Sequence, residues 1–138
     1  MADETGDSAM RSAPGCRDRR TMRAGAAYGQ VPMRVLIVDD HEISRAAIGA
    51  LLRTEGVHVA DVAVGEAAIA VAIAFRPAVA IVDVTPADAT GFRIADLLRA
   101  LLDAPTVVLT SSADKSRFAS RLDSYRFVAK ADLCVQAL

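Results

Sequence analysis

The stretch Val35-Leu36-Ile37-Val38-Asp39-Asp40 decides the fold of this chain, because four consecutive branched apolar residues stop abruptly at two carboxylates. A continuous apolar run of this length is typical of a strand that is buried on both faces of a parallel sheet. Three further apolar runs also end on a polar side chain: 79–82 on Asp83, 107–109 on Thr110, and 127–129 on Lys130. The repeated pattern predicts buried strands that end at one edge of a single sheet.

Segments with helical periodicity alternate with these strands, which predicts an α/β fold. We expect strands at 34–39, 58–64, 79–83, 106–110 and 126–129. Helices are expected at 41–55, 66–75, 92–102 and 114–122, followed by a short last helix of about two turns from 131 onward. Because strands and helices alternate, we expect a doubly wound, five-stranded parallel sheet.

Length and composition indicate one globular domain that follows a tail. The chain has 138 residues, of which 53% are hydrophobic, and this is enough for a single packed core. We assign the domain to residues 33–138. Residues 1–32 contain few large aliphatic side chains and no periodicity, so we interpret them as a disordered tail. The alternative is that translation starts at Met33 and that the tail reflects a misassigned start.

Charge and cysteine content argue against several functional classes. The chain has 16 Lys and Arg against 17 Asp and Glu, so it lacks the basic excess that nucleic-acid binding uses. Cys16 and Cys134 form neither a CxxC pair nor a disulfide framework. The N-terminus lacks a signal-peptide core, and the longest apolar stretch, 67–75, is about half of a bilayer span. We therefore expect a soluble cytoplasmic protein that binds neither membrane nor nucleic acid directly.

The carboxyl ends of parallel strands are where open α/β sheets bind their ligands. Asp39, Asp40 and Asp83 are expected there, and three carboxylates repel one another unless a cation neutralises them. Mg²⁺ fits because it binds carboxylates, a carbonyl and waters, and keeps a position for a phosphate oxygen. If Asp83 attacks a phosphoryl group, an acyl phosphate forms. Lys130 can then neutralise one phosphoryl oxygen while the Thr110 hydroxyl donates to another.

Each of these residues also has a purely structural interpretation. One aspartate of the pair can cap the helix that follows, although a cap needs only one of the two. Thr110 can be an ordinary hydroxyl at a strand end, and an isolated Lys130 is usually solvated. His41 could bind a metal, but the oxygen preference of Mg²⁺ favours a partly exposed residue at the helix start.

Four motifs resemble the receiver domain of two-component response regulators: Val-Leu-Ile-Val-Asp-Asp-His (35–41), Ile-Val-Asp-Val-Thr-Pro (81–86), Val-Val-Leu-Thr-Ser-Ser (107–112) and Phe-Val-Ala-Lys (127–130). The resemblance extends from Met33 to about Leu138 and implies a flavodoxin-like (βα)5 fold. It also implies a signalling domain rather than an enzyme, in which Asp83 accepts a phosphoryl group. The implied Mg²⁺ ligands are Asp39, Asp40, Asp83 and the backbone carbonyl of Thr85.

The same resemblance implies roles for the other residues of the site. Thr110 matches the switch hydroxyl, Lys130 the invariant lysine, and Phe127 the aromatic side chain that changes rotamer. Thr85 and Ser112 match positions that tune the lifetime of the phosphoryl group. The implied partners are a histidine kinase or a phosphotransfer protein, together with a downstream protein, and a weak homodimer is a further alternative.

Some features depart from the family pattern. Pro86 lies three residues after Asp83, whereas the family has a proline four residues on, and Pro86 restricts Thr85 to extended conformations.

The segment Lys130-Ala131-Asp132, with no proline after the lysine, is similar to receivers of LuxR-type regulators. We expect a stand-alone receiver. The alternatives are a degenerate or truncated receiver that acts only by protein contact, and a receiver fragment of a LuxR-type transcription factor.

A phosphohydrolase that uses an aspartyl phosphate is a less favoured hypothesis. That class has a second acid two residues after the nucleophile, where this chain has Thr85. Nucleotide binding is disfavoured as well, because Asp40-His41-Glu42 stands where a glycine-rich turn would follow the first strand.

Overall fold

The computed structural model describes residues 31–63 and 65–138. The tail predicted at 1–32 therefore lies almost entirely outside the described residues, as does Cys16. Within the part of the chain that is described, no helix has both the length and the apolar character needed to cross a bilayer.

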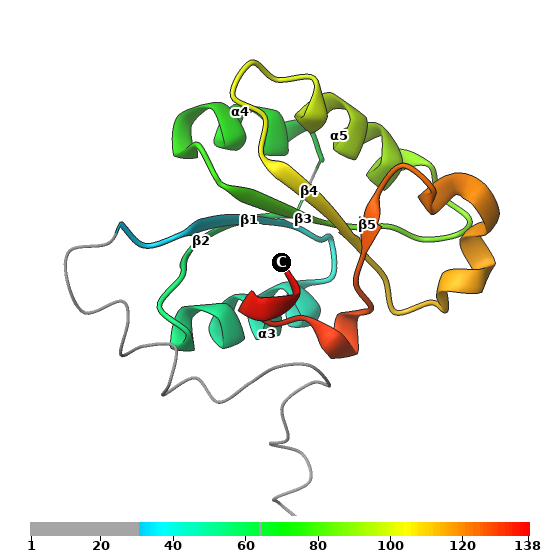
Figure 1. Cartoon of the computed structure of the whole chain (residues 1–138), viewed down its shortest axis with the longest axis horizontal. Helices are drawn as coiled ribbons and strands as arrows, with labels where there is room; N and C mark the ends of the chain where they lie inside the picture. Colours follow the sequence, from blue (N-terminus) through cyan, green and yellow to red (C-terminus); the bar gives the residue numbers. More distant parts are fainter. Residues whose placement is uncertain (1–30, 64) are drawn as a thin grey trace, which may run out of the picture.

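Five parallel strands form one sheet in the order β2-β1-β3-β4-β5 (Figure 1). They are β1 (Arg34–Val38), β2 (His58–Val62), β3 (Val79–Asp83), β4 (Thr106–Thr110) and β5 (Arg126–Phe127). Since every neighbouring pair is parallel, all five strands end at the same edge. The chain runs outward from β1 to β2 and then crosses back to β3, which makes the β1–β3 boundary the place where such sheets bind ligands.

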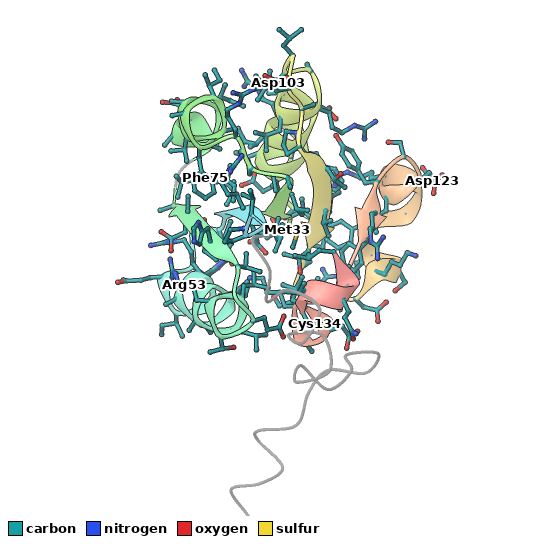
Figure 2. The ribbon with its side chains drawn as sticks, turned by 60° about the vertical axis from the view of Figure 1, so that its left-hand side comes forward. Met33, Arg53, Phe75, Asp103, Asp123 and Cys134 are labelled. Atoms are coloured by element: carbon teal, nitrogen blue, oxygen red, sulfur yellow. The ribbon has the colours of Figure 1, made fainter. Side chains whose placement is uncertain are left out.

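Helices cover both faces of the sheet, as expected for a doubly wound fold. The α-helices are α3 (Glu42–Thr54), α4 (Gly65–Phe75) and α5 (Thr90–Arg99). Helices α4 and α5 lie over one face, and α3 lies over the other together with the C-terminal segment, residues 130–138 (Figure 1). In Figure 2, Arg53 of α3 and Cys134 of the C-terminal segment lie on one side of the sheet, and Asp103, just after α5, lies on the other.

Each face of the sheet has its own hydrophobic core, because alternate side chains of the buried strands point to opposite faces. In β1, Leu36 and Val38 pack toward α4 and α5, whereas Val35 and Ile37 pack toward α3. The continuous apolar runs of β1, β3 and β4 are thus explained by burial on both faces. This arrangement fixes the strand ends, and it therefore fixes the polar residues that follow them.

The predicted elements differ from the structure chiefly after β4. The helix expected at 114–122 is a 3-10 helix, η2 (Lys115–Leu122), and it is interrupted at Ala119, which has φ 50° and ψ −134°. Strand β5 is shorter than the predicted 126–129. Its direction nevertheless continues, because the Val128 and Lys130 amides donate to the carbonyls of Leu109 and Ser111.

Two 3-10 turns, η3 (Lys130–Asp132) and η4 (Val135–Ala137), replace the single last helix expected from 131. Between them Cys134 is extended, with φ −162° and ψ 168°. Leu133 and Cys134 are both buried, so this segment covers the core beside α3 without forming an α-helix. A side-chain oxygen of Glu55, just beyond α3, accepts a hydrogen bond of 2.9 Å from the Val135 amide and ties the segment to that helix.

Candidate functional site

The ends of β1 and β3 bring the predicted carboxylates together. Val38 pairs with Val82, so the residues that follow them, Asp39 and Asp83, are neighbours across the two strands. Asp39 is 2% exposed, whereas Asp40 is exposed. Oxygen atoms of Asp39, Asp40 and Asp83 and a ring nitrogen of His41 all lie within 4.8 Å of one another.

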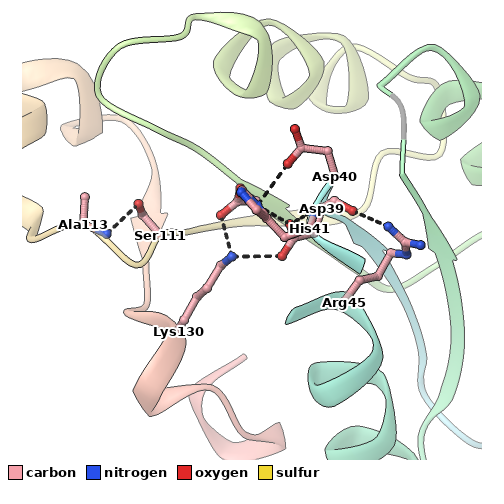
Figure 3. Close-up of polar contacts among 8 residues, drawn as sticks. Asp39, Asp40, His41, Arg45, Ser111, Ala113 and Lys130 are labelled. Atoms are coloured by element: carbon pink, nitrogen blue, oxygen red, sulfur yellow. Dashed lines mark hydrogen bonds and ion pairs between the residues drawn. The ribbon is translucent and has the colours of Figure 1, made fainter. Parts of the chain in front are cut away.

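Lys130 joins the two buried carboxylates from the β5 side of the site. Its Nζ lies 3.0 Å from Oδ2 of Asp39 and 3.0 Å from Oδ1 of Asp83. The Lys130 side chain is 17% exposed, and those of Asp39 and Asp83 are 1% and 8% exposed. The Lys130 amide donates to the Ser111 carbonyl, which anchors the lysine backbone to the end of β4. In Figure 3, the lysine side chain extends from the C-terminal segment to Asp39.

These contacts shift the pKa values of the three charged groups. Burial raises the pKa of Asp83, the nearby Asp39 carboxylate raises it further, and Lys130 offsets only part of this, so the pKa of Asp83 is raised. Burial also opposes ionisation of Asp39, but hydrogen bonds from the His41 amide and Lys130 lower its pKa overall. Burial lowers the pKa of Lys130, yet the two carboxylates together raise it above its ordinary value.

His41 lies close to all three carboxylates, because it follows the Asp39-Asp40 pair directly after β1. Its backbone amide donates to Oδ1 of Asp39 at 2.9 Å. Its Nδ1 is 3.0 Å from Oδ1 of Asp40, 3.2 Å from Oδ1 of Asp39 and 3.7 Å from Oδ2 of Asp83. The imidazole is 62% exposed, as the sequence analysis expected, but its nitrogen points into the site.

Thr110 and Phe127, the two predicted switch residues, lie next to the site on β4 and β5. Thr110 pairs with Asp83 across the two strands and is 1% exposed. Among the described residues, its Oγ1 is the buried side-chain polar atom that has no hydrogen-bond partner. Phe127 is half-buried, and its ring lies 5.9 Å from that of Phe118. The two side chains are therefore close to the site without contacting the carboxylates through any hydrogen bond.

The loop that follows β3 lines a pocket of about 250 Å³ beside the carboxylates. Thr85 lines it, and the Thr85 carbonyl accepts a 3.4 Å hydrogen bond from the Asp88 amide. Gly91 approaches the loop so closely that an added Cβ would lie 2.5 Å from the Asp83 carbonyl oxygen. The lining residues come from the ends of β1, β2 and β3, the loop after β3 and the starts of α4 and α5: Val38, Asp39, Asp40, Ala63, Gly65, Val82, Asp83, Thr85, Asp88, Thr90, Gly91 and Ile94.

An aromatic group connects this loop with η2 and β5. The ring of Phe118 lies between Phe127 and Phe92, with its centroid 6.0 Å from that of Phe92. The Arg121 guanidinium stacks over the Phe92 ring at 4.2 Å and donates a 3.1 Å hydrogen bond to the Pro86 carbonyl. Arg121 thus attaches the loop carrying Pro86 to η2.

The residues present fit a divalent cation. Three carboxylates supply the hard oxygen ligands that Mg²⁺ prefers, and their spacing is close to the diameter of about 4.2 Å across its coordination shell. Lys130 neutralises Asp39 and Asp83 on one side, which leaves Asp40 and the pocket side open. Ser112 is exposed at the end of β4, where Ser111 Oγ accepts a hydrogen bond from the Ala113 amide (Figure 3).

Sequence reasoning missed two residues that shape the site. Arg45 donates a 2.8 Å hydrogen bond to the Asp39 carbonyl and so fixes the turn after β1. Its position in the first turns of α3 was a signal, because basic side chains there can fold back toward the strand end. Asp88 was missed as well: its Oδ1 accepts from the amide and hydroxyl of Thr90, which begins α5.

Comparisons with known proteins agree with this geometry. The sequence model of the response regulator receiver domain matches residues 35–131. A protein-glutamate methylesterase/protein-glutamine glutaminase 2 from Anaeromyxobacter dehalogenans (strain 2CP-C) is 37% identical over 95 residues, which are 67% of this chain. The match spans only 27% of that relative, so it concerns about a quarter of the relative's length.

Solved structures show the same fold. The chemotaxis protein CheY4 of Vibrio cholerae is similar with a TM-score of 0.65 and 23% identity, over 72% of this chain and 88% of that one. The response regulator TrrA of Thermotoga maritima, solved with Mg²⁺ and BeF, is similar with a TM-score of 0.61 and 20% identity. That likeness covers 70% of this chain and 85% of the Thermotoga chain. At these identities the likeness establishes the flavodoxin-like fold.

Proposed function

The chain belongs to the response regulator receiver domain family of two-component signalling, and from this membership we propose that it is a phosphoacceptor switch whose acceptor is Asp83. The observation that carries the proposal is the contact of Lys130 with Asp83 beside a second buried carboxylate, Asp39. A raised pKa at Asp83 fits this role, because burial and the nearby Asp39 carboxylate disfavour its negative charge, which a bound cation would offset.

The proposed reaction transfers a phosphoryl group from a phosphohistidine of a kinase or a phosphotransfer protein. An Asp83 oxygen attacks phosphorus, the P–N bond breaks, and the departing imidazole takes the electron pair, which leaves an aspartyl phosphate. Lys130 is placed to neutralise a phosphoryl oxygen, because its Nζ already contacts the attacking carboxylate. Asp39, Asp40, Asp83 and the Thr85 carbonyl would hold Mg²⁺, which when bound screens the negative charges of the two reactants.

The proposed switch uses the unpartnered hydroxyl of Thr110. A phosphoryl oxygen on Asp83 would give this hydroxyl an acceptor that it lacks among the described residues. Movement of Thr110 would open space for Phe127, whose ring packs on Phe118, and so change the surface read by a downstream protein. Thr85, which lines the pocket, and Ser112, which is exposed just after β4, are proposed to tune the lifetime of the phosphoryl group. Action in the cytoplasm, where kinase and phosphodonor meet the protein, is part of the same proposal.

A second candidate function is protein contact without phosphorylation. The observation that favours it is the C-terminal segment, which has two 3-10 turns in place of a last α-helix and so alters the face beside β5. Because the chain spans about a quarter of its curated relative, any output activity of a longer protein also stays a proposal.

Labelling with acetyl phosphate, a small acyl-phosphate donor, tests the leading proposal. We expect Mg²⁺-dependent labelling of the wild-type protein and none of Asp83→Asn. Asp61→Asn is the matched control, since Asp61 is an exposed aspartate of β2 that does not line the pocket, and it should be labelled normally. Equal labelling of both variants would refute the assignment of Asp83. A folded wild-type protein that takes no label from acetyl phosphate or a phosphorylated kinase would favour the second candidate.

A further inference from the structure

We propose that His41 is a nitrogen ligand of the metal site and that it increases the preference of the site for first-row transition ions such as Co²⁺ and Ni²⁺ over Mg²⁺. The inference rests on the proposed function only for the location of the cation. It concerns which divalent ion this particular chain selects, and it follows from where the His41 ring lies.

The distances around the His41 Nδ1 match those between ligands of one ion. Two atoms bound side by side to an octahedral ion, each at about 2.1 Å, lie roughly 3.0 Å apart. Nδ1 is 3.0 Å from an Asp40 oxygen and 3.2 Å from an Asp39 oxygen. The Asp83 oxygen is 3.7 Å away, still within the span of one coordination shell. A single ion can therefore contact all four groups with little movement of the side chains.

Hydrogen bonds near the His41 backbone position the residue, whereas its exposed ring is not fixed by packing against the core. The imidazole is 62% exposed, so no core contact dictates its rotamer. Its backbone is fixed by the amide that donates to Oδ1 of Asp39, and the Asp39 carbonyl is held in turn by Arg45. A side chain that has solvent available and yet turns its nitrogen toward three carboxylates is oriented by the same groups that would bind a cation.

Ligand chemistry gives the selectivity. An imidazole nitrogen suits Co²⁺, Ni²⁺, Cu²⁺ and Zn²⁺, whereas Mg²⁺ prefers oxygen and keeps its waters. In a site made only of carboxylates and a carbonyl, the increase in affinity from Mg²⁺ to Co²⁺ depends on the metal alone. If His41 is a ligand, its imidazole adds a further increase in Co²⁺ affinity. A substitution of His41 removes this further increase.

The test uses the untagged full chain and titrates Co²⁺, Ni²⁺ and Mg²⁺ by calorimetry, with the visible absorption of bound Co²⁺ as a second readout. The variants are His41→Ala and, as the matched control, His58→Ala. His58 is the other of the two histidines, is exposed, and begins β2 at the edge of the sheet opposite the site. Nitrogen coordination is read directly from the electron spin echo modulation of bound Cu²⁺, in protein with and without ¹⁵N.

We expect His41→Ala to weaken Co²⁺ and Ni²⁺ binding by at least about 10-fold, the smallest loss typical of removing even an outer-shell partner of a metal, and to change Mg²⁺ binding far less. His58→Ala should bind all three ions like the wild-type protein. A Cu²⁺ spectrum without nitrogen coupling would overturn the inference, as would unchanged Co²⁺ affinity in His41→Ala. Tighter Mg²⁺ binding with unchanged Co²⁺ binding would also overturn it, because His41 would then be a side chain that the ion displaces.

These outcomes are separate from failure of the proposed function. A wild-type protein that binds none of the ions, Mg²⁺ included, would contradict the cation site itself. A protein that binds Mg²⁺ and labels at Asp83 but shows no His41 effect would contradict this inference alone.

Discussion

The Nζ of Lys130 lies 3.0 Å from Oδ1 of Asp83, with both side chains largely buried at the strand ends. Removing the ammonium leaves Asp83 and Asp39 facing each other without a neutralising group. We expect Lys130→Met to lower the free energy of unfolding at pH 7 by about 1–3 kcal/mol, less than the roughly 3–5 kcal/mol for fully buried pairs because water reaches this one. Urea unfolding measures the difference.

The pH dependence of this ion pair has a definite sign. The pKa of Lys130 is raised above its ordinary 10.5 in the folded protein, so the pair stabilises the fold fully below pH 10.5. This stabilisation is lost as the pH rises through the higher folded-state value. The stability gap between wild type and Lys130→Met should therefore shrink above pH 10.5, and a gap that stayed constant there would contradict the contact.

Asp83→Asn should stabilise the protein in the absence of divalent ions. Burial and the Asp39 carboxylate raise the pKa of Asp83, so its ionised form reduces stability at pH values above that pKa, and asparagine removes this charge. Addition of Mg²⁺ should reverse the order, since an ion at 100 times its Kd stabilises the wild type by about 2.7 kcal/mol. Thermal unfolding with EDTA and with Mg²⁺ checks both; a less stable variant in EDTA would contradict the prediction.

Gly91→Ala should destabilise the domain and disturb the acceptor. The new Cβ would lie 2.5 Å from the Asp83 carbonyl oxygen and 2.8 Å from Val84 Cγ1, and backbone cannot move as cheaply as a side chain end. We expect a loss of about 1–3 kcal/mol, together with slower acetyl-phosphate labelling. Gly49→Ala is the contrast, because its Cβ would meet the flexible end of Arg53 at 3.1 Å and Ile37 Cδ1 at an ordinary contact distance of 3.8 Å. It should be neutral or stabilise by about 0.5–1 kcal/mol.

Tyr125 should ionise far above a free tyrosine. Burial, followed by the hydrogen bond that its hydroxyl donates to Asp96, raises the pKa of Tyr125 to about 12 from 10.0. Because the unfolded chain loses this proton first, stability should fall as the pH rises from 10 to 12. The phenolate absorbance of Tyr28→Phe, which leaves Tyr125 as the only tyrosine, reads this directly. Asp96→Asn should move the midpoint back toward 10.0; no movement would contradict the role of Asp96.

Sequence patterns located the strands best where burial dominates. The runs at 79–83 and 106–110 agree residue for residue with β3 and β4, because such short, continuous apolar runs are typical of strands buried on both faces. The interruption of η2 at Ala119 could not be predicted, since alanine favours helix and the break depends on how Phe118 and Leu122 reach the core. The extended backbone at Cys134, between two 3-10 turns, could not be predicted either, because the two neighbouring buried residues, Leu133 and Cys134, also fit a helix.

Convergence of the acidic residues could also be predicted, since it depends only on parallel strands and on residues directly after them. The placement of Asp39, Asp83 and Lys130 side by side agrees with that expectation. The orientation of His41 could not be predicted, because an exposed side chain at a helix start has several rotamers of similar energy. The contact of Arg121 with Pro86 could not be predicted from the sequence either, because one side chain joins two segments that are distant in the sequence.

That contact has a mechanical consequence. The guanidinium of Arg121 donates a hydrogen bond to the Pro86 carbonyl in the loop after β3 and stacks over the Phe92 ring at the start of α5. The Arg121 side chain therefore couples the position of this loop to that of η2. A movement of η2 would therefore pull on the loop that carries Pro86 or break this hydrogen bond.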